Sequence, residues 1–359
     1  MKLIHLAGNR PQFIKLAPFL LATKGKNIDN IIIHSGQHYD YEMSKIFFDD
    51  LQIPTPNYHL EAGGGTHTSQ TSRVMLGTEE IMNKEKPDYL VIYGDTNTTL
   101  AGAIVAYKMN IPFAHVEAGL RENVWRPEEM NKKVSDQFAM FCFCPIKRAC
   151  TTLKNEGVVK DAIFLTGDIT YDTFKYAQKI LDTKATVKVP AKPYYLLTMH
   201  RAETVDFADK VGPIIDALLA IDHDIIFPIH PRTEKSLKNL NLFDKLTSTG
   251  KVTVIPPVGY FDLLKLLKYA KLVITDSGGV IKEAFYSEKP GVAIDAASEY
   301  NEIYDLGCSV LTGQNTKKIV AAVKKMKDLD ISAIVKKHNP FGDGKAGMKM
   351  VKIMMDAGK

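Results

Sequence analysis

The chain has 359 residues, of which 45% are hydrophobic and 24% are charged, the balance of an ordinary globular protein. Its length exceeds what one typical hydrophobic core needs, and it therefore predicts two domains. Lysine and arginine total 46 against 41 acidic residues, a formal charge of +5. This mild surplus suits an anionic small molecule, whereas a nucleic-acid partner is not expected because such proteins concentrate basic residues in a stripe.

The pattern of cysteines argues against a zinc site and against a disulfide framework. Cys142 and Cys144 flank Phe143 in an apolar run, which predicts buried structural thiols, and neither Cys150 nor Cys308 completes a zinc-ligand pattern. A disulfide framework is not expected, and this favours a reducing compartment.

The apolar start of the chain is too short for a signal peptide, and no apolar run reaches membrane-spanning length. We therefore expect a soluble, cytoplasmic protein with no membrane partner and no metal.

Short apolar runs alternate with longer amphipathic ones along the first half of the chain. The predicted strands are 2–7, 30–35, 89–93, 113–117, 141–145 and 162–167, and the predicted helices are 11–23, 68–85, 97–109 and 146–156.

The second half repeats the scheme. Its predicted strands are 194–200, 224–230, 251–255, 271–276 and 290–295, and its predicted helices lie near 206–222, 260–270, 278–287 and 315–327. The alternation predicts an α/β protein of two Rossmann-like, doubly wound domains with parallel sheets and helices on both faces. The seam is expected near 167–174, with a loop at 183–193. Since ligands bind beyond the carboxyl ends of such strands, the polar residues that follow each strand are the informative ones.

Two motifs follow strands of the first half. In GNRPQFIK (8–15), Pro11 suits the first turn of a helix, and Arg10 and Lys15 are placed to reach a phosphate; the alternative is a surface turn with solvated charges. In YGDTNTTLAG (93–102), Asp95 stands between a buried strand and a helix. Taken alone, this second motif favours an N-cap, by Asp95 or by the threonines after it, over catalysis.

The segment HVEAGLRENVWRPEEMNKK (115–133) carries more ionisable groups than a buried strand end usually does. They are His115, Glu117, Arg121, Arg126, Glu128 and Glu129. Such clustering favours a functional site. The alternative is a capping box with a salt-bridge cluster around Pro127.

Two His-Arg pairs end strands of the second half, His200–Arg201 in TMHRAE and His230–Arg232 in FPIHPRT. Their equivalent positions favour binding of anionic groups.

The sharpest local signal is TDSGGVIKE (275–283). Gly278 and Gly279 permit close backbone approach at the start of a helix, where free N–H groups favour phosphate, and Glu283 suits the hydroxyls of a ribose. The alternative is a helix capped by Ser277 or Asp276 with no ligand. The motif is neither a Walker A loop nor a GxGxxG fingerprint, which disfavours ATP hydrolysis and nicotinamide binding.

Together these motifs resemble the non-hydrolysing UDP-N-acetylglucosamine 2-epimerase family, from GNRPQFIK through SGQHYDYEMSKIFFDDL (35–51) to FGDGKA (341–346). The resemblance covers essentially the whole chain, in order. It implies a glycosyltransferase-B-like fold of two Rossmann-like domains around a cleft, and a homodimer. It places residues 1–170 and a returning C-terminal helix (344–359) in the first domain, and residues 171–343 in a UDP-binding second domain.

The resemblance also implies roles for single residues. The catalytic set is Asp95, Glu117, Glu128 and His200, and the substrate-binding set is Arg10, Lys15, Arg121, His230, Ser277, Gly278, Gly279 and Glu283. The family reaction removes the C2 proton and expels UDP to leave a 2-acetamidoglucal, and UDP then adds back with protonation on the opposite face. That chemistry needs a base, an opposing acid and cations for the leaving diphosphate, and no cofactor.

Several positions depart from the usual family pattern and leave the sugar open. Asp295 stands where an arginine is common, and Lys132 replaces another arginine. An inward Asp295 favours a neutral sugar; the alternative is that it turns away to pair with a lysine such as Lys289. Stretches such as GGTHTSQTSR (64–73) look closer to the UDP-2,3-diacetamido-2,3-dideoxy-glucuronate branch. Gln37, His38 and Arg73 resemble a family site for a second, activating substrate molecule, although Asp40 departs from it.

Three other functions remain open from the sequence. A hydrolysing 2-epimerase would use nearly the same site and release free sugar and UDP. A retaining glycosyltransferase on the same fold is disfavoured, because transfer needs no base at C2 such as the pair Glu117 and Glu128. A non-catalytic sugar-nucleotide-binding protein is disfavoured by the intact catalytic set.

Overall fold

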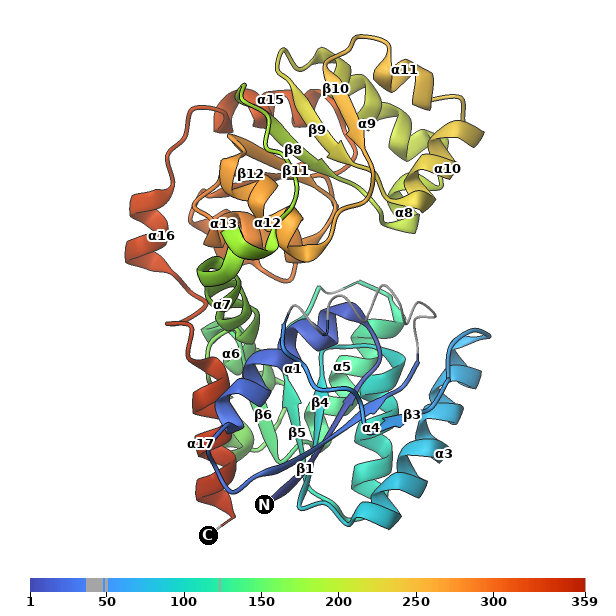
Figure 1. The fold of residues 1–359 in the computed structure, drawn as a ribbon, viewed down its shortest axis with the longest axis vertical. Helices are drawn as coiled ribbons and strands as arrows, with labels where there is room; N and C mark the ends of the chain where they lie inside the picture. Colours follow the sequence, from blue (N-terminus) through green and yellow to red (C-terminus); the bar gives the residue numbers. More distant parts are fainter. Residues whose placement is uncertain (37–47, 49–50, 123, 359) are drawn as a thin grey trace. The chain divides into compact units, whose positions relative to one another are not determined.

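The computed structural model describes residues 1–36, 48, 51–122 and 124–358. They form two compact units: Met1–Ala177 together with Pro340–Lys359, and Gln178–Asn339. Each unit is a parallel β-sheet with helices packed against it (Figure 1). Much of the motif at 35–51, including Gln37, His38 and Asp40, lies outside the described residues.

In the first unit, the described residues form a seven-stranded parallel sheet in the order β3-β2-β1-β4-β5-β6-β7. Its strands are β1 (Lys2–Ala7), β2 (Asp29–His34), β3 (Tyr58–His59), β4 (Tyr89–Tyr93), β5 (Phe113–Val116), β6 (Phe141–Cys144) and β7 (Ile163–Leu165). The helices are α1 (Arg10–Thr23), α3 (His67–Glu85), α4 (Asn97–Lys108), α5 (Pro127–Phe138), α6 (Lys147–Asn155) and α17 (Ala346–Ala357), with a 3₁₀ turn at Lys160–Ala162. Helix α7 (Ile169–Lys184) runs from this unit into the second.

In the second unit, the described residues form a six-stranded parallel sheet in the order β10-β9-β8-β11-β12-β13. Its strands are β8 (Tyr195–Thr198), β9 (Ile225–Pro228), β10 (Val252–Ile255), β11 (Leu272–Thr275), β12 (Gly291–Ala293) and β13 (Ser309–Leu311). The helices are α8 (Ala202–Val205), α9 (Ala208–Ala220), α10 (Pro231–Asn239), α11 (Phe243–Thr247), α12 (Tyr260–Tyr269), α13 (Gly278–Tyr286), α14 (Asn301–Asp305), α15 (Thr316–Met326) and α16 (Ser332–His338).

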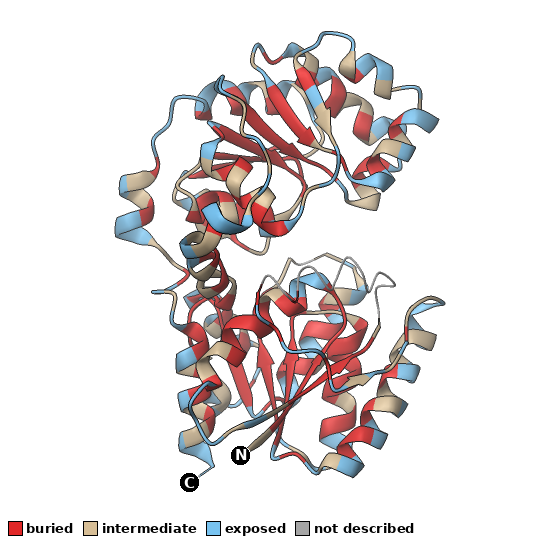
Figure 2. Ribbon diagram, viewed as in Figure 1, coloured by how far each residue is buried: buried red, intermediate tan, exposed pale blue. Residues whose placement is uncertain are grey.

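The strands form because each is a short apolar run that is covered on both faces. Every residue of β4 and of β11 is buried, and Figure 2 shows the central strands of both sheets in the colour of buried residues. The strand order reverses between β1 and β4 in the first unit and between β8 and β11 in the second. These reversals are where doubly wound sheets bind ligands, so the residues that follow these four strands define the candidate site.

The C-terminal helix belongs to the first unit, where α17 packs on α1. A Cβ added to Gly347 would lie 2.8 Å from the carbonyl oxygen of Pro18, so the glycine allows the two helices to approach. The carboxylate of Asp172 accepts the N–H groups of Ala346 (3.0 Å) and Gly347 (2.9 Å) at the start of α17. Burial raises the pKa of Asp172 to about 6.

The eleven strands predicted from the sequence are all present, most of them shortened by one to three residues. The edge strands β3 and β13 were not predicted, because runs of two or three residues carry no periodicity. Residues 169–174 of the segment expected as the seam form the start of α7, the helix that runs from the first unit into the second, and Asp168 accepts the N–H of Thr170 at 2.8 Å.

Other expectations concern the cysteines, membranes and metals. Cys142 and Cys144 are buried and unpaired thiols, as predicted. None of the helices within the described ranges combines the length and apolar character needed to cross a lipid bilayer. Within the same ranges, no group of three or more His, Cys, Asp or Glu side chains is arranged to hold a metal ion.

Candidate active site

At the β1/β4 reversal of the first unit, Lys15 and Glu117 form an ion pair. Their side chains are only 9% and 10% exposed. Gly94, which follows β4, lies against both: a Cβ there would be 3.0 Å from Lys15 Nζ and 3.7 Å from Glu117 Oε2. The structure thus brings the predicted Lys15 and Glu117 together beside the turn that carries Asp95.

Glu117 itself has a backbone conformation that non-glycine residues rarely adopt. Its φ is +73°, in the left-handed region, immediately after β5. The N–H groups of Glu117 and Ala118 both donate to the carbonyl of Phe143, at 3.2 and 3.1 Å, which holds the turn. Such conformations persist where surrounding structure fixes them, and they cluster at functional sites.

Asp95 is half-buried and does not cap the helix that follows it. Thr96 is the N-cap residue of α4, and the Thr99 hydroxyl accepts the Thr96 N–H at 3.1 Å. The capping explanation for Asp95 is therefore wrong. Asn131 of α5 holds the Asp95 carbonyl at 2.8 Å.

Gln12 joins the loops that follow β1 and β4. Its amide oxygen accepts the N–H of Gly8 at 2.7 Å, and its amide nitrogen donates to the carbonyl of Tyr93 at 2.8 Å. Asn9 caps α1 by accepting the Gln12 N–H, and Arg10 is exposed at the first position of that helix.

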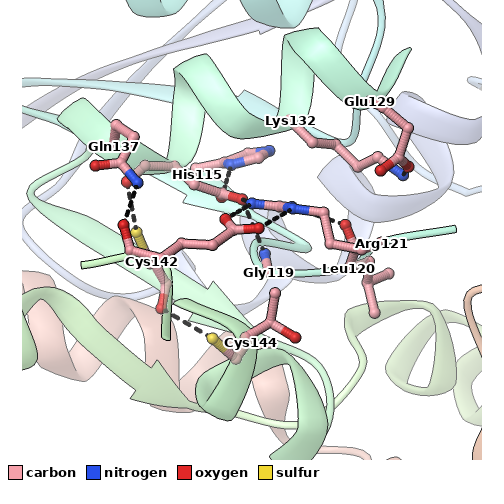
Figure 3. Close-up of polar contacts among 12 residues, drawn as sticks. His115, Gly119, Leu120, Arg121, Glu129, Lys132, Gln137, Cys142 and Cys144 are labelled. Carbon is pink, nitrogen blue, oxygen red and sulfur yellow. Dashed lines mark hydrogen bonds and ion pairs between the residues drawn. The ribbon is translucent and has the colours of Figure 1, made fainter. Parts of the chain in front are cut away.

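A buried polar network lies behind this cluster. His115 contacts an Asp136 oxygen at 2.7 Å through Nδ1 and the Gly94 carbonyl at 2.6 Å through Nε2. Arg121 donates to Asp136 at 2.8 Å and to both carboxylate oxygens of Glu156 at 3.0 and 2.6 Å (Figure 3). These contacts, with a further bond to the Leu120 carbonyl, use most of the Arg121 donors and favour a positioning role over substrate binding.

Glu128 is half-buried at the second position of α5. The next residue, Glu129, is buried and pairs with Lys132, the residue that replaces a common arginine. Pro127 begins the helix, and its N-cap residue Arg126 makes no side-chain capping bond. The capping-box alternative is wrong, whereas the salt-bridge cluster that it included does exist.

At the β8/β11 reversal of the second unit, α13 presents its N-terminus. Ser277 is the N-cap and accepts the N–H of Val280 at 3.4 Å. A Cβ at Gly278 would meet nothing closer than the Tyr300 ring at 3.8 Å, so the space before the helix is open on that side. Glu283 is half-buried within the same helix.

The two predicted His-Arg pairs come together after β8 and β9, with the His200 and His230 rings 6.1 Å apart. His230 Nδ1 accepts the N–H of Arg232 at 3.1 Å, which leaves Nε2 as the donor of the neutral ring. Burial, assisted by the charges of His200 and Arg232, lowers the pKa of His230. A neutral donor of this kind can still hydrogen-bond a phosphate oxygen.

Asp295 pairs with Arg201, and its other oxygen accepts the N–H of Ala296 at 2.7 Å. Pairing with a lysine such as Lys289 was the expected alternative for Asp295, but the partner in the structure is Arg201. Sequence reasoning missed this pair because 94 residues separate the two side chains.

The sequence offered Asp276 only as a possible helix cap, but the cap is Ser277, and Asp276 is buried beside His200. The signal available was its position directly after a strand at the reversal, in the same motif as Ser277.

The model of the family described as UDP-N-acetylglucosamine 2-epimerase matches residues 22–355. The chain belongs to this family. It is therefore an epimerase that acts on nucleotide sugars. The UDP-N-acetylglucosamine 2-epimerase of Methanocaldococcus jannaschii is 43% identical over 368 residues, with 99% of each chain covered. The UDP-2,3-diacetamido-2,3-dideoxy-D-glucuronate 2-epimerase of Pseudomonas aeruginosa is 41% identical over 332 residues and covers 90% of this chain and 92% of its own.

A solved structure of the Methanocaldococcus jannaschii UDP-GlcNAc 2-epimerase, in complex with UDP-GlcNAc and UDP, is similar with a TM-score of 0.88. It is 41% identical and covers 99% of this chain and all of its own. The similarity confirms the predicted fold class, two Rossmann-like domains of the glycosyltransferase-B-like type.

Proposed function

We propose that the protein inverts C2 of a UDP-linked 2-acetamido sugar, of the UDP-N-acetylglucosamine and UDP-N-acetylmannosamine type, by eliminating UDP and adding it back. The observation that carries the proposal is the buried Lys15–Glu117 pair beside the Gly94–Asp95 turn, in a chain of this family. Shielding from water makes a carboxylate a stronger base, and the neighbouring cation keeps it in the ionised form that can accept a proton.

The acids of the first unit supply the proton transfers. A C2 proton has no adjacent carbonyl to acidify it, so its loss must be coupled to departure of the C1 phosphate. Glu117 is the proposed base, and Asp95 and Glu128 are the candidates for the opposing acid and for holding the sugar. Lys15 stabilises the ionised form of Glu117 in the ground state, and Arg10, exposed nearby at the start of α1, is assigned to the substrate.

The second unit supplies the diphosphate site. The N-terminus of α13 offers backbone N–H groups at Ser277, Gly278 and Gly279, and Glu283 is placed to accept ribose hydroxyls. His200 and His230 add hydrogen-bond donors that strengthen as charge develops on the leaving phosphate.

The test is proton NMR in deuterated water with a panel of UDP-2-acetamido sugars. Incorporation of deuterium at C2 with interconversion of the two epimers is the expected result. Free 2-acetamido sugar and UDP as the sole products would instead indicate the hydrolysing enzyme. Binding of UDP without any exchange at C2 would indicate a non-catalytic protein and would overturn the proposal.

The identity of the sugar follows from the charge around Asp295. The relatives at 43% and 41% identity act on different sugars, so identity alone does not choose between them. In the Asp295–Arg201 pair the carboxylate and the guanidinium neutralise each other, so Arg201 is not an added cation for a C6 carboxylate. We therefore expect UDP-N-acetylglucosamine to be at least as good a substrate as the diacetamido-glucuronate. A strong preference of the unmodified protein for the glucuronate, measured as kcat/KM, would refute this assignment.

The same proposal includes a homodimer through α3, α4 and α5, which pack side by side. Their exposed apolar side chains include Leu76, Tyr107, Met130 and Phe138, and the rings of Tyr107 and Phe138 lie 4.6 Å apart. Such clustering is typical of an interface. Tyr107→Glu should yield monomers in sedimentation velocity, whereas the control Val159→Glu, at an exposed site elsewhere in this unit, should not. A monomeric unmodified protein would contradict the proposal.

The proposed setting is the cytoplasm, where the product would serve as a precursor of cell-surface polysaccharide.

A further inference from the structure

Asp276 directly follows β11, the strand that lies beside β8 at the reversal of the second sheet. It is 1% exposed. One of its oxygens, Oδ2, accepts the backbone N–H of His200 at 2.9 Å and of Arg201 at 2.8 Å. The carboxylate thus ties the loop after β8 to the end of β11, and it fixes where the His200 backbone lies.

The second oxygen of the same carboxylate is unusual. Within the described part of the chain, Oδ1 is buried and makes no hydrogen bond. A buried polar atom in this state costs free energy unless a partner is close, and such atoms are rare in native proteins. The atom that it faces is His200 Nδ1, at 3.5 Å. The His200 side chain is 45% exposed, so one edge of the ring meets a buried carboxylate while the rest is accessible to a ligand.

The neighbouring basic residues Arg201 and His230 are engaged elsewhere, so His200 is the side chain that faces Oδ1 of Asp276. Arg201 pairs with Asp295, and the Nδ1 atom of His230 is already occupied by the N–H of Arg232. Burial raises the pKa of Asp276, while His200 and the two backbone N–H groups act in the opposite direction. Because Oδ2 accepts two N–H bonds, the carboxylate form is the one that the contacts favour.

We propose that Asp276 is a positioning residue for His200. It holds a proton on Nδ1 of the imidazole and turns Nε2 to the substrate, and Nε2 donates to the diphosphate once it has taken up a second proton and the imidazolium has formed. The inference rests on the proposed function of His200 at the diphosphate. The distance of 3.5 Å shortens to a hydrogen bond when substrate closes on the ring, as contacts of catalytic histidines often do.

Two kinds of experiment test the proposal. The first is a long-range proton–nitrogen correlation spectrum of protein labelled with ¹⁵N-histidine, recorded in alkaline buffer, with the His200 peaks assigned by their loss in His200→Gln. The expected tautomer is Nδ1–H in the unmodified protein. In Asp276→Asn, whose amide keeps an oxygen for the backbone N–H groups and presents an NH₂ to the ring, the proton should move to Nε2.

The second is kinetic. Asp276→Asn should lower kcat roughly 10- to 100-fold with UDP affinity changed less than about threefold, the pattern expected when an orienting partner of a reactive group is lost. The matched control is Asp262→Asn. The Oδ1 atom of Asp262 likewise accepts two successive backbone N–H groups, from Thr186 (2.6 Å) and Val187 (2.8 Å), but it faces no histidine in the described structure. This variant should keep kcat within about twofold.

The double variant Asp276→Asn/His200→Gln separates action through His200 from a general structural effect. If Asp276 works through His200, the double variant has the kcat of His200→Gln alone. Multiplicative losses, an Nε2–H tautomer in the unmodified protein, or equal losses in Asp276→Asn and Asp262→Asn would each overturn the proposal. Should Asp276→Asn fail to fold, the tautomer of the unmodified protein decides alone.

The tautomer measurement needs no substrate, so the positioning role of Asp276 and the proposed function can be refuted independently of each other. Absence of C2 exchange with every UDP-sugar would refute the proposed function and leave the Asp276–His200 geometry to be judged by the spectrum.

Discussion

The Lys15–Glu117 pair allows catalysis and stability to be separated in one set of variants. Both side chains are about nine-tenths buried, at 9% and 10% exposure, so neither charge is well solvated once its partner is removed. Removing one member of such a buried pair typically costs about 3–5 kcal/mol, because the remaining charge is left uncompensated. Removing both charges together costs less, and is sometimes neutral.

We therefore expect Lys15→Met and Glu117→Gln each to lower the free energy of unfolding in urea, by up to about 3–5 kcal/mol, and the double variant to recover most of that loss. Activity should behave differently. Glu117→Gln and the double variant should both lose at least about 100-fold in C2 exchange, or roughly 2.7 kcal/mol of transition-state stabilisation, since the proposed base is absent in each.

The measurements are urea unfolding followed by circular dichroism, and deuterium exchange at C2 under saturating substrate. A stable double variant without activity is the outcome that the structure predicts. Near-normal turnover in a folded Glu117→Gln protein would remove Glu117 from the mechanism. A double variant no more stable than either single variant would show that the two charges do not stabilise each other.

Three further predictions concern acid stability, the phosphate site and metals. Burial lowers the pKa of His5 to about 4 from 6.5, so the stability that the neutral ring contributes is complete above pH 6.5 and is lost as the pH falls toward 4. Between pH 7 and pH 5, the free energy of unfolding in urea should fall by about 2 kcal/mol more in the unmodified protein than in His5→Gln. Gly278→Val should fold, because a Cβ there meets only the Tyr300 ring at 3.8 Å, but should abolish UDP binding in calorimetry by crowding the start of α13; unchanged UDP affinity would refute this site. Activity should persist after exhaustive EDTA treatment, since backbone N–H groups and histidine donors serve the phosphates; loss of activity that magnesium or zinc restores would contradict this expectation.

The apolar runs predicted the strands well because burial on both faces demands continuous hydrophobic residues, as in YLVIY and LVIT. The positions of Lys15, Glu117, His200 and Ser277 were also predictable, since parallel strands place their carboxyl ends along one edge. The extents of α5 and α7 were not predicted. Their first turns carry the polar and charged residues that are also typical of loops, and their helical state depends on packing.

Contacts between distant residues account for the rest of what the sequence did not reveal. Asn131 reaches the Asp95 carbonyl across 36 positions, and Asp276 reaches His200 across 76. The left-handed conformation of Glu117 has no local signal either, because glutamate has no special tolerance for it. It follows from the two bonds that Glu117 and Ala118 make to the Phe143 carbonyl, which only the folded sheet provides.

In both units a buried side chain at the end of one strand holds the backbone that follows a neighbouring strand, as a contact to a carbonyl in the first unit and to an N–H in the second. In the first, the imidazole of His115 contacts the Gly94 carbonyl and so holds the turn before Asp95. In the second, the carboxylate of Asp276 accepts the His200 N–H. In each case a buried side chain from one strand end fixes the backbone of the neighbouring one, so a reactive residue is positioned by a residue that need not touch the substrate. An error of about 1 Å in such placement is enough to cost a hundredfold in rate. Substitutions at His115 should for this reason resemble substitutions at Asp276, lowering kcat more than they weaken binding.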